Sequence, residues 1–395
     1  MERCDNRDRP DHKEFAAWLL PAAFWIVLSC AVVSFILISL TTPNGDWDGM
    51  TIWNMRARFL ARGTDHWRNA FVASPGLWHP DYPLLLSATI ARCWKYVGHE
   101  PVVVPIAIAF LFTFSSVAML WSSLAFLRNS RVGYLGGIVL LSAYSFVGLG
   151  AGQYADAVAG LFILSAIVIL AVYDSAPTKG NRGLLVLAGV AAGLCAWTKN
   201  EGLLFVVLLL AVRGFVQLKM KGAKLSVREF APMMAGLLPV LAVITYFKLG
   251  VAPGNYYLKF GADYSPGPMQ QLARAVFDNA TVKDKLTDIS RYWLIAKTML
   301  GEISRFGGRI ISVPLVMLVY FVCRGKEKSS ISDTKTGIAI LALMLVGYCC
   351  VYLTTPLNLA YHLNHSLSRL LLQVWPSAVF LFFMATSSAK LQAID

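Results

Sequence analysis

Long apolar runs recur from one end of this sequence to the other. They cover approximately residues 15–40, 101–127, 133–150, 155–173, 183–197, 202–217, 230–250, 307–323, 336–354 and 367–387. A transmembrane helix needs about 20 mostly apolar residues to cross roughly 30 Å of hydrocarbon. The chain is 57% hydrophobic and 14% charged, whereas soluble domains are about 25% charged. We therefore predict an all-α polytopic membrane protein of about ten transmembrane helices, forming one domain over residues 1–395. A long later extracytoplasmic loop is predicted at 251–306, with an amphipathic helix near residues 283–300 that either covers the site, binds the acceptor or lies passively at the surface.

The net charge of +13 reflects membrane topology rather than nucleic-acid binding. Basic residues lie in the N-terminal tail and in alternate short loops, which by the positive-inside rule are cytoplasmic. The first apolar run is too long for a signal-peptide core and is predicted to be a retained helix. We expect a multi-pass protein of the plasma or inner membrane with a cytoplasmic N-terminus. The seven cysteines show no CxxC spacing and indicate no disulfide or zinc framework.

The first extracytoplasmic loop, residues 41–100, is the first long polar interruption. It opens with Asp46 and Asp48, and an amphipathic helix is predicted to follow them. Arg58 lies on a different face of this helix from its apolar side chains and is suited to bidentate pairing with phosphate. His79 and Asp81 follow in a turn restrained by prolines, and a second interfacial helix is predicted to start at Pro83.

Each acid in this loop has a simpler interpretation. Asp48 precedes a helix, where a carboxylate commonly serves as an N-cap, and Asp46 stands beside Gly45 as turn residues often do. The combination of two acids, a restrained histidine and an interfacial helix on one side of the membrane favours a catalytic or substrate-contacting role.

Remote parts of the chain place further candidates on the same side. Asp156 opens an apolar span, where an ionisable residue is a functional candidate, although helix capping is an alternative. Lys199 and Glu201 lie between two short spans and either neutralise each other or bind phosphate through the lysine. Arg369, just inside the last span, needs an anionic partner.

His362 and His365 have a spacing compatible with one helical face, but no further ligand completes a metal site. We predict no metal site and no firm cofactor, and a divalent ion on the two aspartates of the first loop lacks support from ligand count. His362 is retained as a substrate-contacting candidate.

Several of these stretches, in this order, resemble membrane glycosyltransferases of the GT-C superfamily, in particular the protein O-mannosyltransferase and aminoarabinose transferase branch. The stretches span most of the chain and comprise Asp46-Trp47-Asp48 with residues 52–60, the turn at 79–85, Tyr154 to Ala157, residues 197–202, and Ser368-Arg369 with residues 373–376.

The resemblance implies a GT-C-like multi-helix fold with two interfacial helices, a polyprenyl-phosphate sugar as donor, and inversion at the anomeric carbon. Asp48 or Asp46 would match the family's general base. His79, Lys199 and Arg369 would match positions near the donor phosphate, and Asp156 a second acidic position. This chain has Asp-Trp-Asp where the family often has Asp-Glu, so either aspartate fits the base.

The predicted function is transfer of a sugar to a hydroxyl on a glycan, lipid or protein at the extracytoplasmic side, as part of cell-envelope glycosylation. A carboxylate suits proton abstraction from that hydroxyl, and fixed cations suit the phosphate leaving group. Two alternatives stay open. A transporter or flippase would favour an internal repeat, and we find none. A non-catalytic membrane subunit would tolerate loss of both aspartates.

Overall fold

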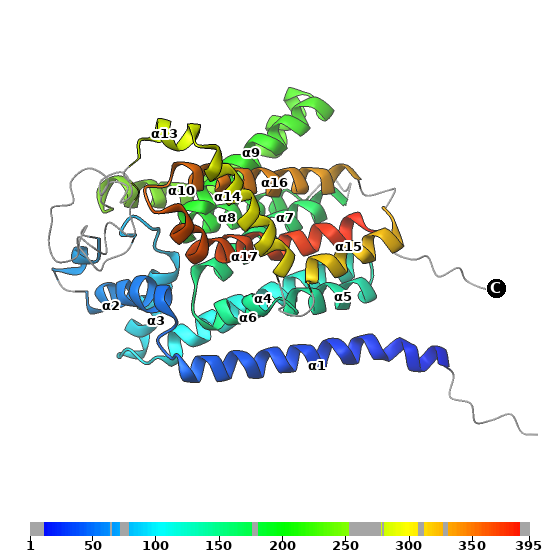
Figure 1. The fold of residues 1–395 in the computed structure, drawn as a ribbon, viewed down its shortest axis with the longest axis horizontal. Coiled ribbons are helices and arrows are strands. Elements are labelled where there is room, and N and C mark those ends of the chain that lie inside the picture. Colours follow the sequence, from blue (N-terminus) through cyan, green and yellow to red (C-terminus); the bar gives the residue numbers. More distant parts are fainter. Residues whose placement is uncertain are drawn as a thin grey trace, which may run out of the picture.

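The computed structural model describes residues 12–63, 65–71, 79–175, 181–252, 278, 280–306, 312–326 and 331–387. The regular structure of these residues is helical throughout, apart from one isolated bridge between Lys326 and Thr386. Figure 1 shows an elongated bundle whose long helices run roughly along its length, with the short helices α2 and α3 at one end.

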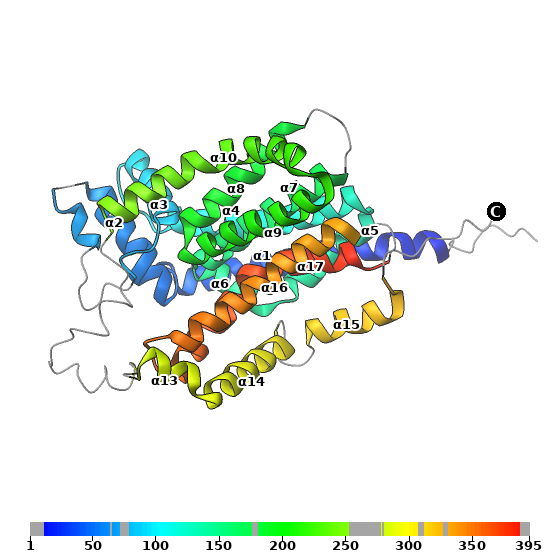
Figure 2. The same ribbon diagram turned by 90° about the horizontal axis from the view of Figure 1, so that it is seen from above.

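The first half of the bundle contains the helices α1 (His12–Thr41), α4 (Val103–Leu127), α5 (Ser130–Leu141), α6 (Tyr144–Ala151), α7 (Ala155–Ser175), α8 (Arg182–Thr198) and α9 (Asn200–Lys221). The second half contains α10 (Ala223–Gly250), α13 (Val282–Thr287), α14 (Ile289–Arg305), α15 (Val313–Arg324), α16 (Ile331–Thr354) and α17 (Leu359–Ala385). In Figure 2 the helices α14 and α15 lie along one flank of the bundle.

Seven helices in the described residues are long and apolar enough to cross a membrane, which makes the chain a multi-pass integral membrane protein. They are α1, α4, α7, α9, α10, α16 and α17. Helices suit this environment because hydrocarbon offers no partners for backbone polar groups. A bent pair, α5 and α6, and the shorter apolar helices α8 and α15 occupy the remaining predicted spans in order. That all of these cross the bilayer stays a prediction.

The predicted span at 133–150 is not one straight helix. The helices α5 and α6 meet at an angle of 66°. Leu141 ends α5, Ser142 caps it, and Ala143 has an extended backbone (ψ 100°), which turns the chain before Tyr144 begins α6. The bend brings Gly152 and Gln153 back beside the end of α1, where the acidic loop begins.

The helices α7 and α17 form the centre of the bundle. In the most apolar 18-residue stretch of each helix, 78% of the stretch is buried in the bundle, whereas the corresponding share for α1 is 22%. The two helices approach closely at Gly160, where an added Cβ would lie 3.3 Å from the backbone oxygen of Gln373. This contact places the polar side chain of Gln373 beside the start of α7.

Glycines also hold α8 against α10 and set the turn that follows. A Cβ at Gly189 would lie 2.0 Å from the oxygen of Met233, so only glycine permits this approach. At Gly202 a Cβ would lie 2.1 Å from the oxygen of Cys195, which shows how tightly α9 folds back on α8. Lys199 and Asn200 stand at this reversal, at the end of the bundle near α7's first turn.

The first long loop contains the helices that the sequence predicts. A π-helical turn, η1 (Gly49–Asn54), leads into α2 (Met55–Arg62), a 3-10 turn follows as η2 (Trp67–Phe71), and α3 covers Leu85–Val97. Of the later loop predicted at 251–306, residues 253–277 and 279 lie outside the described part. The amphipathic helix predicted near residues 283–300 is divided into α13 and α14 by Asp288, which caps α14.

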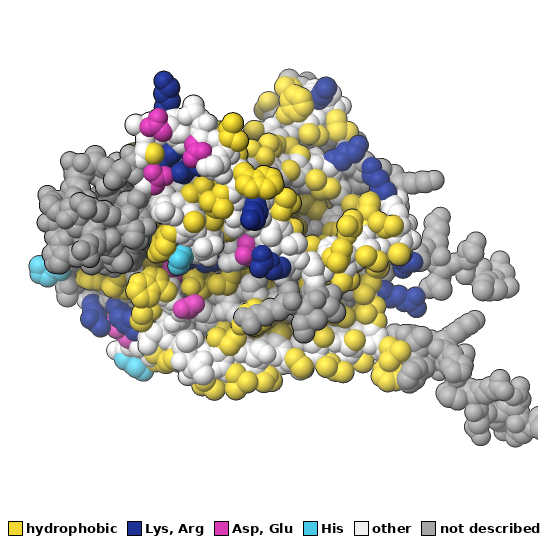
Figure 3. Space-filling model, viewed as in Figure 1, with side chains coloured by type: hydrophobic (Ala, Val, Ile, Leu, Met, Phe, Trp, Pro, Cys, Tyr) yellow, Lys and Arg dark blue, Asp and Glu magenta, His cyan; other side chains and the backbone are white. Residues whose placement is uncertain are grey.

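The two ends of the bundle differ in their charged side chains. The face in Figure 3 has Lys and Arg without Asp or Glu at the end away from α2 and α3, whereas toward the other end Lys and Arg lie together with His, Asp and Glu. Arg128 donates a hydrogen bond to the oxygen of Thr386, so the loops after α4 and α17 meet at the basic end. That the basic loops are cytoplasmic stays a prediction.

Candidate active site

The acidic loop after α1 is held against the link between α6 and α7. The backbone N–H of Asp46 donates to the oxygen of Gly152 at 3.0 Å. Gly45 has φ +80°, and a Cβ at Gly49 would lie 2.5 Å from the Gly152 oxygen, so both glycines are needed for this approach. The sequence Asn-Gly-Asp-Trp-Asp-Gly is thus shaped by close backbone contact.

Side-chain amides complete this attachment. Asn54 Nδ2 donates to Gln153 Oε1 at 2.6 Å and to the oxygen of Asn44 at 2.8 Å. Gln153 Nε2 in turn donates to the oxygen of Pro43 at 3.1 Å. Gln153 adopts a left-handed backbone with φ +60°, which orients its side chain toward the loop. The two aspartates therefore project from a fixed backbone.

Asp46 is exposed and is oriented by two hydrogen bonds. Its Oδ1 accepts from the backbone N–H of Trp47 at 2.8 Å, and its Oδ2 accepts from the Tyr154 hydroxyl at 3.1 Å. Burial and the neighbouring Asp46 raise the pKa of Tyr154, so this hydroxyl remains protonated and donates. The turn interpretation of Asp46 holds for one of its oxygens only.

Asp48 pairs with Arg369 of α17. It occupies the N-cap position of η1 but makes no side-chain capping bond, so the capping interpretation is wrong. Arg369 Nη1 donates instead to Asp48 Oδ2, and its guanidinium lies 5.3 Å from the centre of the Tyr154 ring. The predicted need of Arg369 for an anionic partner is confirmed. Burial raises the pKa of Asp48 above its ordinary value, and Arg369 opposes part of that rise.

A second ion pair lies deeper in the bundle. Lys199 Nζ donates to Asp156 Oδ1 at 2.8 Å, and Gln373 Nε2 donates to the same oxygen at 2.6 Å. The Asp156 and Lys199 side chains are 1% and 4% exposed. Tyr348 donates to Gln373 Oε1 at 3.1 Å, which fixes the amide. Asp156 is thus a buried ionic partner and not merely a cap.

Glu201 supplies the second carboxylate near Lys199. Its Oε1 lies 3.3 Å from Lys199 Nζ, so mutual neutralisation holds in part, with Asp156 as the closer partner. Two buried polar atoms here, Glu201 Oε2 and Arg369 Nε, have no hydrogen-bond partner among the described residues. The site therefore has one hydrogen-bond acceptor and one donor that its own side chains leave unsatisfied.

The His79 turn stacks beside this ionic pair. His79 packs flat on Tyr82 with ring centres 4.5 Å apart, and Tyr82 packs flat on Trp53 at 5.8 Å. Lys199 Nζ lies 5.5 Å from the centre of the Tyr82 ring, so the turn adjoins the buried lysine. Burial and the nearby cations lower the pKa of His79 well below its ordinary value. The imidazole is therefore neutral near pH 7.

Asp81 fixes the turn to helices α9 and α10. Its Oδ2 accepts from Asn200 Nδ2 at 2.8 Å and lies 3.4 Å from Lys248 Nζ. Lys248 also donates to Asn200 Oδ1 at 2.7 Å and to the Asp81 backbone oxygen, while buried Arg56 donates to the oxygen of His79. Asp81 is a structural anchor in this geometry.

Two predicted candidates lie in other environments. Arg58 donates to Asn44 Oδ1 at 3.0 Å and lies 3.6 Å from Glu100, on the outer side of α2. His362 forms a hydrogen bond of 2.9 Å with Thr355 Oγ1 two turns of α17 before Arg369. The partners in these contacts, Asn44, Glu100 and Thr355, are not members of the two ion pairs.

The cluster also contains residues that sequence reasoning did not select as candidates. Tyr154, Gln373, Lys248 and Arg56 all contact predicted site residues. Tyr154 and Gln373 stand within the stretches that carry the family resemblance, so that pattern is the signal for them. Arg56 is buried while Arg58, two residues on, is not; helical periodicity alone does not tell which arginine faces inward.

The groups brought together are Asp46, Asp48, Asp156, Glu201, Lys199 and Arg369, from the first loop and from α7, α9 and α17 with the α8–α9 turn. Carboxylates outnumber cations in this set by four to two. Among the described residues, no three His, Cys, Asp or Glu side chains gather closely enough to hold a metal ion. The arrangement offers a half-buried carboxylate next to a fixed guanidinium, backed by a buried lysine.

A search of protein-family models, of curated proteins and of solved structures found no match to this chain.

Proposed function

We propose that this chain is an inverting glycosyltransferase of the GT-C type. It transfers a sugar from a polyprenyl-phosphate donor to a hydroxyl acceptor at the end of the bundle that carries Asp48 and Arg369. The proposal rests on one observation above all: a carboxylate and a guanidinium that are 321 residues apart in sequence form an ion pair at one end of the bundle. The proposed reaction needs a base and a cation in the same place.

Asp48 is the better candidate for the general base. It is half-buried with a raised pKa, whereas Asp46 is exposed and oriented by Tyr154. In the proposed reaction the acceptor oxygen attacks the anomeric carbon while Asp48 takes its proton. The bond from that carbon to the phosphate oxygen breaks, and its electron pair stays on the phosphate. Such base catalysis contributes about a hundredfold to ten-thousandfold in rate.

Arg369 links donor binding to the freeing of this base. In the resting arrangement its guanidinium holds Asp48, and the acids around it outnumber the cations. A donor phosphate that takes over Arg369 releases the Asp48 carboxylate for proton transfer. Lys199 lies deeper in the bundle than Arg369 and is paired with Asp156. From there it stabilises developing negative charge on the leaving phosphate at longer range. His79, being neutral, contributes by shape and hydrogen bonding rather than by charge.

Apolar side chains lie beside this end of the bundle. Leu86, Ile90, Phe112 and Val158 line a small hollow between α3, α4, α6 and α7 that also reaches Tyr154. We propose that α2 and α3 lie in the membrane interface with their apolar sides in lipid. In the same proposal, ten helices span the bilayer, the basic loops are cytoplasmic, and the end of the bundle that carries Asp48 and Arg369 is extracytoplasmic.

The direct test uses purified protein in liposomes. A panel of polyprenyl-phosphate hexoses and pentoses is supplied with alcohol, peptide and lipid acceptors, and release of polyprenyl phosphate is measured. We expect turnover of at least one donor and its loss in Arg369→Gln. Tight binding of donors without any turnover by the wild type would contradict the proposal.

A transporter or flippase is the second candidate, because the 66° bend between α5 and α6 is a feature that transporters also use. It predicts movement of the intact lipid-linked substrate between leaflets. A leaflet-specific quenching assay on the same liposomes separates the two functions, since translocation without cleavage favours transport.

A further inference from the structure

The amide of Gln373 connects the buried ion pair of Asp156 and Lys199 to a tyrosine of α16. Its Nε2 donates to Asp156 Oδ1 at 2.6 Å, and its Oε1 accepts from the Tyr348 hydroxyl at 3.1 Å. Gln373 is fully buried, and Tyr348 is 1% exposed. An ionised carboxylate can only accept hydrogen bonds, so the amide nitrogen must face Asp156 and the tyrosine must donate to the amide oxygen. The orientation of this amide is therefore determined by its neighbours.

Hydrogen bonds between α16 and α17 hold this face of α17 in place. Besides the bond from Tyr348 to Gln373, Tyr352 and Ser366 share a hydrogen bond of 2.8 Å. Arg369 lies between these two points and four residues before Gln373, so about one helical turn, roughly 6 Å along the axis, separates the guanidinium from the amide. The same helix therefore contacts both ion pairs of the candidate site.

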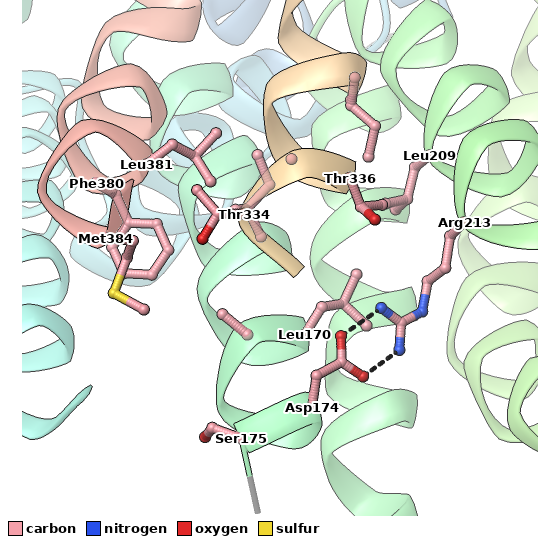
Figure 4. Close-up of a pocket in the computed structure, with 14 residues that line it drawn as sticks. Leu170, Asp174, Ser175, Leu209, Arg213, Thr334, Thr336, Phe380, Leu381 and Met384 are labelled. Atoms are coloured by element: carbon pink, nitrogen blue, oxygen red, sulfur yellow. Dashed lines mark hydrogen bonds and ion pairs between the residues drawn. The ribbon is translucent and has the colours of Figure 1, made fainter. Parts of the chain in front are cut away.

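The pair of Asp156 and Lys199 needs a further donor because an ammonium is a point charge. Its single bond to one carboxylate oxygen does not fix the plane of the carboxylate. At the other end of α7, Asp174 meets the planar guanidinium of Arg213 instead, with one bond of 2.8 Å to each carboxylate oxygen (Figure 4). That pair is oriented by its own two bonds, whereas the pair with the lysine is oriented with the help of the amide of Gln373.

A second carboxylate makes the position of the ammonium sensitive to this amide. Glu201 Oε1 lies 3.3 Å from Lys199 Nζ, and Glu201 Oε2 has no hydrogen-bond partner among the described residues. With the Asp156 carboxylate free to turn away, the flexible stem of the lysine would let its ammonium shift toward Glu201. The attraction between the ammonium and a leaving phosphate falls with distance, so such a shift would weaken it.

We propose that Gln373 is a positioning residue for sugar transfer, which acts through Asp156 to hold the ammonium of Lys199 where it stabilises the leaving phosphate. Tyr348 in turn orients Gln373. The inference rests on the proposed glycosyltransferase function. It gives both residues a part in the reaction through the geometry of the ion pair rather than through a bond to the donor.

The test measures release of polyprenyl phosphate in liposomes, with a polyprenyl-phosphate hexose or pentose that the wild type turns over. Gln373→Leu removes both hydrogen bonds of the amide and should lower kcat about ten- to a hundredfold. The KM for the donor should change less than about threefold, because the ammonium acts on charge that develops in the transition state. Tyr348→Phe should give a smaller loss of kcat in the same direction.

Ser377→Ala is the matched control. Ser377 is fully buried one turn further along α17, and its hydroxyl has no hydrogen-bond partner among the described residues. Its replacement removes a polar group from the same helix without breaking a bond, so the control should retain the wild-type kcat.

Gln373→Glu separates positioning from a purely structural role. While the new acid is protonated, it can donate to Asp156 and accept from Tyr348; once it loses its proton, it places a like charge beside Asp156. The other charged side chains of the cluster are Lys199, Glu201 and Arg369. The ratio of the kcat of this variant to the wild-type kcat at the same pH should therefore fall as the pH rises.

Size exclusion checks that each variant is folded, and Tyr348→Phe tests the proposal even where Gln373→Leu does not fold. Wild-type kcat in Tyr348→Phe, or in folded Gln373→Leu, would overturn the positioning role and leave the proposed function intact. So would Gln373→Glu that is no more active than Gln373→Leu at every pH. A wild type that turns over no donor would instead contradict the proposed function and this inference with it.

Discussion

Removing one partner of the buried pair at the start of α7 should destabilise the protein strongly. In Lys199→Met, Asp156 loses the cation at 2.8 Å and keeps only the amide of Gln373 at 2.6 Å. Both side chains of the pair are almost fully buried, so water cannot take the place of the lysine. Breaking such a pair costs about 3–5 kcal/mol, and we expect that loss in the free energy of unfolding.

The assay is SDS-induced unfolding in mixed micelles, followed by circular dichroism. Arg62→Ala is the control, because Arg62 pairs with Glu100 at the surface and exposed pairs contribute about 0–1 kcal/mol. The double variant Asp156→Leu with Lys199→Met removes both charges and should recover most of the loss. A single variant that loses less than about 1 kcal/mol, or a double variant no more stable than Lys199→Met, would refute the reasoning.

Three further outcomes follow from the same contacts. Because the base must be ionised and burial raises the pKa of Asp48, kcat/KM should fall with decreasing pH at values above about 3.9, the ordinary aspartate value. Tyr154→Phe removes the hydrogen bond that orients the exposed carboxylate of the loop, and steady-state kinetics should show a loss of about 0.5–1.5 kcal/mol in transition-state stabilisation. Gly189→Val should abolish folded protein on size exclusion, since its Cβ meets backbone at 2.0 Å, whereas Gly183→Val, with nothing within 4 Å, should behave as wild type.

Much of the fold could be predicted from the sequence because hydrocarbon imposes a simple rule on length and composition. Apolar runs of about 20 residues must be helices, and the predicted runs correspond to helices in the structure. The predicted helix after Asp48 and the one near Pro83 also exist, because capping, proline and periodicity are local signals. The sequence also predicts that Arg369 needs an anion, since an arginine that close to hydrocarbon is costly alone.

The pairings themselves could not be predicted, because nothing local in the sequence relates Asp48 to Arg369 or Asp156 to Lys199. They arise from the close helix approaches at Gly160 and Gly202, which depend on the packing of the whole bundle. The N-cap interpretation of Asp48 is wrong for the same reason. Its carboxylate accepts a hydrogen bond from the remote Arg369 and not from a backbone N–H of the helix that follows it. The bend between α5 and α6 likewise could not be predicted from hydropathy, because both helices are apolar.

The most direct test of the proposed function is turnover of a polyprenyl-phosphate sugar by Asp48→Asn. The variant keeps the shape of the side chain and removes its capacity to take a proton, while Asp65→Asn changes an exposed aspartate of the same loop and is the control. We predict that Asp48→Asn lowers kcat by about a hundredfold to ten-thousandfold with the protein still folded, and that the control retains wild-type turnover. Equal turnover in the wild type and in Asp48→Asn would contradict the assignment of Asp48 as the base.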